Sequence, residues 1–319
     1  MVNASQSYSN ITEDVQNVAL LRTIIFSTMS TVPSVFFLFI NGTMLVSLRS
    51  KPVFRETSRY ILLFNLLFAD TVQLTQCQVQ FLISVCRVKL AYSLCTALSM
   101  LANLTTGISP LTLVIMPLER YVAVCYPLRH ASIITIRSTT VAIIVIWAVS
   151  SLNNVTRVLL FLQFPFEKVE SLQIRDLCSN IALVTPRDNY DKAYTCLVFV
   201  SAGLAVIYSY TGVVVAARSA STDKASAHKA RKTLLLHLIQ LGLSLSSMIY
   251  YPLLIALART VSRLVFVWVQ NVFYVLFIIL PRCLSSLVYG LRDQTIRPVP
   301  NLMYYLCCHL KFPVEPGPG

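Results

Sequence analysis

The stretch LTLVIMPLERYVAVCYPLRH, residues 111–130, joins a very apolar segment to a group of charged side chains. Residues 101–116 contain no Asp, Glu, Lys, Arg or His, whereas an acid and a base, Glu119 and Arg120, then stand side by side. Two more basic residues follow soon after Pro127. An Arg at the end of an apolar helix can anchor the helix at a membrane surface, pair with a neighbouring carboxylate or engage a partner outside the lipid.

The composition of the whole chain is that of a membrane protein. Of its 319 residues, 56% are hydrophobic and only 12% are charged, which is about half the charged fraction of a typical soluble domain. The formal net charge of +13 comes from short clusters between apolar runs. That pattern is typical of loops facing anionic lipid and argues against binding to nucleic acid. No catalytic triad pattern, Walker loop or metal-ligand cluster indicates an enzyme or a metal site.

Seven apolar segments are long enough to cross a membrane, since a bilayer core needs about 20 helical residues. We therefore predict an all-α membrane protein, a seven-helix transmembrane bundle over residues 23–290, between a tail at 1–22 and another at 291–319. The second and third segments carry more polar residues than lipid-facing helices do, so we expect them inside the bundle. The segments are Thr23–Leu48, Tyr60–Val85, Tyr92–Val124, Thr139–Phe161, Ala193–Ala217, Thr233–Leu257 and Leu264–Tyr289.

The distribution of Lys and Arg predicts the orientation of the bundle. These residues are concentrated after the first, third and fifth segments and in the last tail, while most acids lie on the other side. By the positive-inside rule the N-terminus is outside and the C-terminus inside. Sequons at Asn3 and Asn10 would then be open to glycosylation, whereas the sequon at Asn154 lies within a span. Cys307 and Cys308, in the inner tail, are candidates for palmitoylation.

Asp70, in NLLFAD at residues 65–70, is an acid in the middle of a predicted span. A charge there costs a few kcal/mol unless it is paired or hydrated. One interpretation is a structural carboxyl satisfied by Asn41, Ser109 or water. The other, compatible with the first, is a cation-binding or switching site within the bundle. We expect no cofactor for this chain, and the one candidate ion is a sodium ion near Asp70.

The motif MPLERYVAVCYPLRH, residues 116–130, resembles the end of the third helix in odorant receptors of the rhodopsin-like (class A) G-protein-coupled receptor superfamily. Most odorant receptors have Asp at Glu119, and the Pro-Leu-Glu variant is similar to fish odorant receptors of the 131-2-like type. The resemblance extends from Asn41 to about Arg297. Its other landmarks are Asn41, Asp70, Cys95, Trp147, the pair Ser209-Tyr210, KARKTLLLH at 229–237 and LVYGLRD at 287–293.

The resemblance implies a plasma-membrane receptor for a small-molecule odorant that activates a stimulatory heterotrimeric G protein. It implies a disulfide between Cys95 and Cys178. The residues that it implies for coupling to the G protein are Glu119, Arg120, Tyr121, Tyr210, His237 and Tyr289. A polar site within the bundle would contain Asn41, Asp70, Ser109 and Ser285. The expected ligand pocket contains Ser99, Asn103, Thr106, Phe199, Tyr251, Gln270 and Tyr274, although polar residues at such positions also serve helix packing.

Two departures and two alternatives qualify this interpretation. Ser285 and Ser286 stand where the superfamily has Asn-Pro, and the nearest proline is Pro281, so the activation geometry of the last helix is an open question. Ala102 replaces the acid that aminergic receptors use, which disfavours an amine ligand. The alternatives are a non-olfactory receptor of the same superfamily and a seven-span transporter or pump. A retinal pump would need a Lys in the last segment, where the only basic residue is Arg282.

Overall fold

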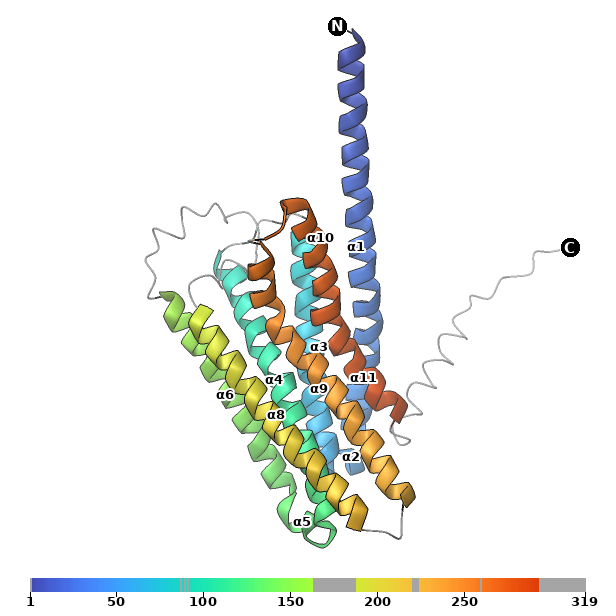
Figure 1. The fold of residues 1–319 in the computed structure, drawn as a ribbon, viewed down its shortest axis with the longest axis vertical. Coiled ribbons are helices and arrows are strands. Elements are labelled where there is room, and N and C mark those ends of the chain that lie inside the picture. Colours follow the sequence, from blue (N-terminus) through green and yellow to red (C-terminus); the bar gives the residue numbers. More distant parts are fainter. Residues whose placement is uncertain are drawn as a thin grey trace, which may run out of the picture.

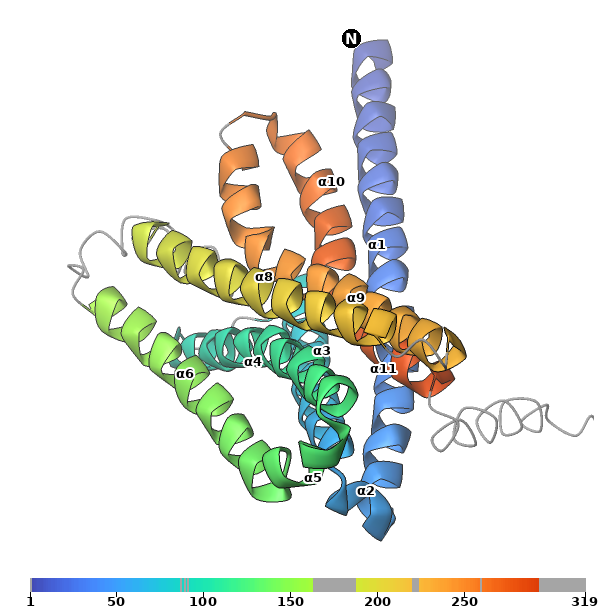
Figure 2. The ribbon, with the colours of Figure 1, turned by 60° about the horizontal axis from the view of Figure 1, so that its bottom comes forward.

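The computed structural model describes residues 2–86, 88, 90, 92–162, 188–219, 224–258 and 260–292, and the regular elements in these ranges are helices. Seven long helical stretches lie side by side as a bundle (Figures 1 and 2). Each contains one of the seven predicted segments. They are α1 (Val2–Ser50), α3 (Ser58–Val85), α4 (Tyr92–Cys125), α6 (Ile136–Leu162), α8 (Asp188–Ser219), α9 (Lys224–Ala258), and the succession of α10 (Arg263–Phe273), η4 (Tyr274–Ile279) and α11 (Leu280–Arg292).

Three short helices, α2 (Pro52–Glu56), η1 (Pro127–Arg129) and α5 (His130–Ile133), lie in the connections that follow α1 and α4. Figure 1 places α2 and α5 at the same end of the bundle, which we call the α2–α5 end. At the opposite end α1 projects well beyond the other helices. Residues 2–22 of the predicted tail thus belong to α1, although the membrane-compatible part begins at Thr23, where the predicted span begins.

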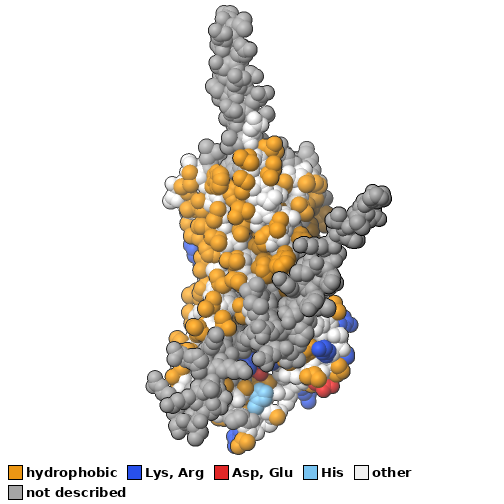
Figure 3. Space-filling model, turned by 90° about the vertical axis from the view of Figure 1, so that its right-hand side faces the viewer, with side chains coloured by type: hydrophobic (Ala, Val, Ile, Leu, Met, Phe, Trp, Pro, Cys, Tyr) orange, Lys and Arg blue, Asp and Glu red, His pale blue; other side chains and the backbone are white. Residues whose placement is uncertain are grey.

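Five helices among the described residues are long and apolar enough to cross a membrane, and α9 is a sixth if its two halves count as one span. The halves, Leu238–Tyr250 and Pro252–Ala258, meet at 46°. Pro252 has no N–H to donate, which accounts for a bend at this point. On the face shown in Figure 3, apolar side chains form a broad covering, and most described charged side chains lie toward one end.

The helix α3 falls outside this apolar set because it carries Asp70 and several glutamines, of which Gln73, Gln76 and Gln78 are buried. Its neighbour α4 has half of its membrane-compatible window buried, against 17–22% for the other four spans. The prediction that the second and third segments pack inside the bundle is therefore confirmed. Their polar residues avoid lipid by facing other helices.

The core of the bundle combines apolar packing with hydrogen bonds between helices. Met44, Leu66, Leu113 and Leu241 are buried in one cluster to which α1, α3, α4, α8 and α9 contribute. Beside it, Trp147 Nε1 on α6 donates to Asn65 Oδ1 on α3 at 2.9 Å, and the Asn65 amide donates to Thr112 on α4 at 2.9 Å. In lipid, such close packing and hydrogen bonding drive helix association, because apolar side chains gain little by leaving one apolar medium for another.

The last helical stretch changes its winding just before a proline. The π-helical turn η4 ends at Ile279, and Pro281 is the second residue of α11. A proline at this point cannot donate to the carbonyl of residue 277, and its ring would clash with that carbonyl in a regular α-helix. The wider π turn is therefore a local response to Pro281, and it precedes a functional candidate, Arg282, by three residues.

Candidate functional site

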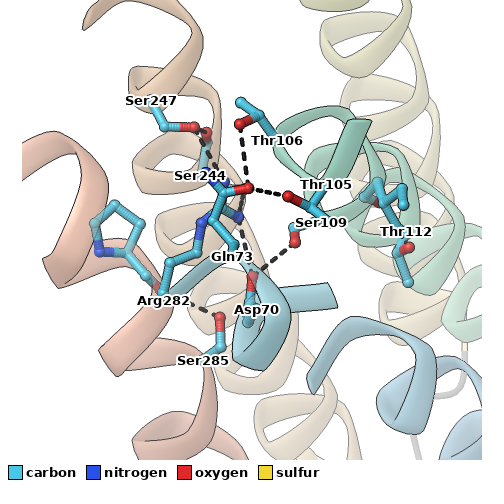
Figure 4. Close-up of polar contacts among 12 residues, drawn as sticks. Asp70, Gln73, Thr105, Thr106, Ser109, Thr112, Ser244, Ser247, Arg282 and Ser285 are labelled. Atoms are coloured by element: carbon cyan, nitrogen blue, oxygen red, sulfur yellow. Dashed lines mark hydrogen bonds and ion pairs between the residues drawn. The ribbon is translucent and has the colours of Figure 1, made fainter. Parts of the chain in front are cut away.

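An ion pair lies buried in the middle of the bundle. Arg282 Nη1 on α11 is 3.0 Å from Asp70 Oδ1 on α3, and the two residues are 1% and 0% exposed (Figure 4). Each charge alone would be costly at this depth, and the pair is electrically neutral as a unit. The two residues are 212 positions apart in the sequence.

Three serines surround this pair. Ser109 on α4 donates to Asp70 Oδ1 at 2.6 Å. On α9, Ser244 accepts from Arg282 Nη1 at 3.5 Å and Ser247 accepts from Nη2 at 3.4 Å. The site therefore connects α3, α4, α9 and α11 through side chains that are all buried.

The structure brings together only part of the predicted polar site. Asp70 and Ser109 are in direct contact, whereas Ser285 donates to the carbonyl of Pro281 on its own helix at 3.2 Å. Asn41 is fully buried, and neither polar atom of its amide has a partner in the described part of the chain. Sequence reasoning missed Arg282 as a member of the site. The signal in the sequence was the position of Arg282. It lies well inside the last predicted span, just as Asp70 lies well inside the second, and a charge of each sign within the spans suggests an ion pair.

A second polar group lies one turn further along α3. Gln73 Oε1 accepts from Thr105 and, at 3.2 Å, from Thr106, both on α4 (Figure 4). The Gln73 amide donates to Cys77 Sγ at 3.7 Å, and the hydroxyl of Tyr274 donates to the Cys77 carbonyl at 3.0 Å. Two predicted ligand residues, Thr106 and Tyr274, are thus both tied to α3. Gln73 was not among the predicted residues.

The remaining predicted ligand residues are less closely associated. Ser99 is 1% exposed, and its hydroxyl has no partner among the described residues. Asn103 and Gln270 are partly buried, and Phe199 packs against the main apolar cluster. The side chain of Tyr251 lies outside the described part of the structure.

At the α2–α5 end, the carboxylate of Glu119 lies between two basic groups. Its Oε2 is 3.7 Å from Arg120 Nε, and its Oε1 is 3.7 Å from His130 Nε2 on α5. Glu119 is only 8% exposed, whereas the Arg120 side chain is 24% exposed. The adjacent acid and base of the sequence are therefore close enough for charge attraction, and α5 contributes a third member, His130.

Tyr121 packs against α8 at this end. The hydroxyl of Tyr208 donates to that of Tyr121 at 3.3 Å, and the ring centroids are 4.8 Å apart. A Cβ placed on Gly212 would lie 2.0 Å from a carbon of the Tyr121 ring, so the ring occupies the space that a side chain would need. On α8 the contact is thus made by Tyr208 and Gly212, one turn apart. Tyr210 is 37% exposed, and its predicted part in the switch stays a prediction.

Most of the other predicted residues have side chains that lie outside the described structure. The side chains of His237 and Tyr289 lie outside it, as do those of Asn3 and Asn10. Cys95 is disulfide-bonded. Its predicted partner Cys178 lies outside the described residues, as do Cys307 and Cys308, so the pairing and the lipid attachment stay predictions.

Comparison with known proteins agrees with this geometry. Residues 40–289 match the model of the 7 transmembrane receptor (rhodopsin family). The chain is 34% identical to Odorant receptor 131-2 of Danio rerio, over 85% of this chain and 82% of that protein. It is 27% identical to Olfactory receptor 4K15 of Homo sapiens, over 76% and 74% of the two chains. It is 24% identical to the olfactory receptor-like protein OLF4 of Canis lupus familiaris, over 85% and 88%.

The long helices, the Glu-Arg pair at the end of α4 and these similarities all agree with one another. The family consists of membrane receptors, which are not enzymes. A match to receptors also argues against the seven-span transporter alternative. This chain belongs to the rhodopsin family of seven-transmembrane receptors, among its odorant receptors.

Proposed function

We propose that this protein is a chemosensory receptor that binds a small odorant within the bundle and activates a stimulatory heterotrimeric G protein at the α2–α5 end. The observation that supports coupling most directly is the arrangement of Glu119 and Arg120. A buried carboxylate holds a partly exposed guanidinium at the end of the most buried spanning helix. In this position Arg120 can exchange Glu119 for an acceptor on a cytosolic partner.

Activation in this proposal is a shift between two arrangements of the helices. A ligand that binds the active arrangement more tightly moves the equilibrium by its difference in affinity, and no chemical reaction is required. The Tyr121 ring over Gly212 connects α4 to α8 close to Arg120. A displacement of α8 would therefore change the packing of the residue next to Arg120.

The ligand in this proposal is a small, largely apolar molecule with a few groups that form hydrogen bonds. Small-molecule sites are usually apolar cavities with a few well-placed polar groups. Thr106 and Tyr274 lie close to α3 through Gln73 and Cys77, and we propose that they are such polar groups. Ala102, one turn before Thr106 on α4, is 5% exposed and carries no acid that could bind an amine.

The proposal can be tested by expressing the receptor in cells with a cAMP reporter and screening a panel of odorants. Cells without the receptor and cells with Arg120→Ala serve as controls. We expect at least one odorant to raise cAMP only in cells with the unmodified receptor. If odorants bind and produce a calcium response without cAMP, the choice of a stimulatory G protein is wrong. If the receptor reaches the surface and no odorant of a broad panel binds to it, the proposed ligand class is wrong.

A further inference from the structure

A sodium ion at Asp70 would have to compete with the charge of Arg282, which is already paired with this carboxylate. A hard cation is held by several oxygen ligands. Asp70 Oδ1 accepts from Ser109 and from Arg282, and Asp70 Oδ2 is the carboxylate oxygen that has no hydrogen-bond partner among the described residues. Of the other side chains expected at the site, Ser285 donates to the Pro281 carbonyl, and the Asn41 amide has no hydrogen-bond partner among the described residues, so neither is hydrogen-bonded to Asp70. An added cation would also lie beside the positive charge of Arg282 and be repelled by it.

We propose that Arg282 supplies from within the chain the positive charge that Asp70 requires, so that this receptor folds and functions without a metal ion at this site. Both terminal nitrogens of the Arg282 guanidinium form contacts. Nη1 contacts Asp70 and Ser244, and Nη2 contacts Ser247. A tethered cation cannot dissociate, so the conformational equilibrium of the bundle does not depend on sodium concentration.

The same geometry gives the pair a mechanical role. Because Arg282 on α11 binds both α3 and α9, these three helices share a charged junction (Figure 4). The removal of either charge leaves the other buried without compensation, which is strongly destabilising, whereas the removal of both is far better tolerated. The pair therefore behaves as a unit, and substitutions in it are non-additive.

The first experiment measures the thermal unfolding of the purified full-length receptor in lipid nanodiscs. Sodium chloride is replaced by choline chloride at constant ionic strength. We expect the same midpoint in both salts for the unmodified receptor. Arg282→Ser removes the tethered cation and leaves Asp70 with the Ser109 hydroxyl, and we expect its midpoint to rise in sodium relative to choline. A sodium-specific rise in the unmodified receptor would overturn the proposal.

The second experiment does not require the variants to be purified. Cell-surface receptor is measured for Asp70→Asn, for Arg282→Gln and for the double variant. We expect loss of surface receptor in each single variant and recovery in the double variant. As a matched control, Arg157→Gln removes the partly exposed ion pair with Asp191, which has an N–O distance of 3.1 Å. Because this pair is in part accessible to solvent, that change should lower the surface level less than either single variant of the central pair does.

The outcomes of the second experiment separate the alternatives. Single variants that reach the surface as well as the double variant would show that the charges are not coupled. A double variant that is lost as completely as the single variants would show that neutrality of the site is not what the fold requires. Either result contradicts the proposal. Neither experiment uses an odorant or a G protein, so their results are independent of the proposed function.

Discussion

The carboxylate of Glu119 lies 3.7 Å from Arg120 Nε and 3.7 Å from His130 Nε2. Attraction at this distance near the protein surface contributes about 1 kcal/mol or less. We therefore expect Glu119→Gln to favour the active arrangement modestly, with ligand-independent cAMP rising by up to about fivefold. The measurement is basal cAMP normalised to surface receptor. Basal cAMP equal to that of the unmodified receptor would show that Glu119 does not restrain Arg120.

Arg120 is the residue that we expect to contact the G protein. Arg120→Ala should abolish the agonist-driven rise in cAMP while the receptor still reaches the surface, because the side chain is partly exposed and its removal leaves little buried space. Ligand binding to membranes, measured in parallel, should persist. Normal signalling by this variant would contradict the coupling role of Arg120 without affecting the assignment of the family.

At the scale of helices, the packing of α4 against α8 depends on the absence of a side chain at Gly212. An added methyl would lie 2.0 and 2.5 Å from two carbons of the Tyr121 ring. We expect Gly212→Ala to destabilise the receptor by about 1–3 kcal/mol, the usual cost of overpacking, less a gain of up to about 1 kcal/mol in helix propensity. The measurement is the midpoint of thermal unfolding.

Gly203, on the same helix, provides the control. A Cβ there would meet nothing within 4 Å, so Gly203→Ala retains the gain in helix propensity without any clash. We expect the two alanine variants to differ in sign, with Gly203→Ala neutral or slightly stabilising. Equal midpoints for the two variants would show that the Tyr121 ring moves aside at no cost.

The helices were largely predictable, because lipid requires long apolar runs and these are visible in the sequence. Their ends were less predictable. The helix α1 begins at Val2 rather than Thr23, and α9 begins at Lys224 rather than Thr233. Hydropathy marks where a helix can lie in lipid, but the backbone continues to form helical hydrogen bonds beyond that point. Helical phase places Tyr208 and Gly212 on one face of α8 and Tyr210 on another, and the predicted role of Tyr210 in the switch stays a prediction.

The central ion pair shows what the sequence pattern could not provide. Asp70 was recognisable because an acid in a span needs a partner, and Ser109 was among the partners considered. Arg282 stands 212 residues away, and only the packing of α11 against α3 brings the two together. A rule that matches each buried acid with a buried base would have found it, because the charges within the spans must balance over the whole bundle.

At the scale of the whole molecule, the structure shows where the basic residues that follow the first and third predicted segments lie in space. Arg55 lies in α2 and Lys51 just before it, Arg129 lies in η1 just before α5, and Arg137 lies at the start of α6, which follows α5. Figure 1 places α2 and α5 at the same end of the bundle. Anionic lipid of the cytosolic leaflet attracts such a surface by about 1 kcal/mol for each nearby basic residue. We therefore expect this end to face the cytosol and the start of α1 to lie outside.

This orientation predicts the accessibility of tags and glycans. An epitope at the N-terminus should be detected on intact cells, and one at the C-terminus only after permeabilisation. Exchange of both Asn3 and Asn10 for Gln should abolish the mobility shift that a glycosidase produces. Asn154→Gln should not affect that shift, because this sequon lies within α6, where the lipid keeps it from the glycosylation machinery. Detection of both tags on intact cells would show that the C-terminus also lies outside. The predicted side of the membrane on which Arg120 meets a partner would then be wrong.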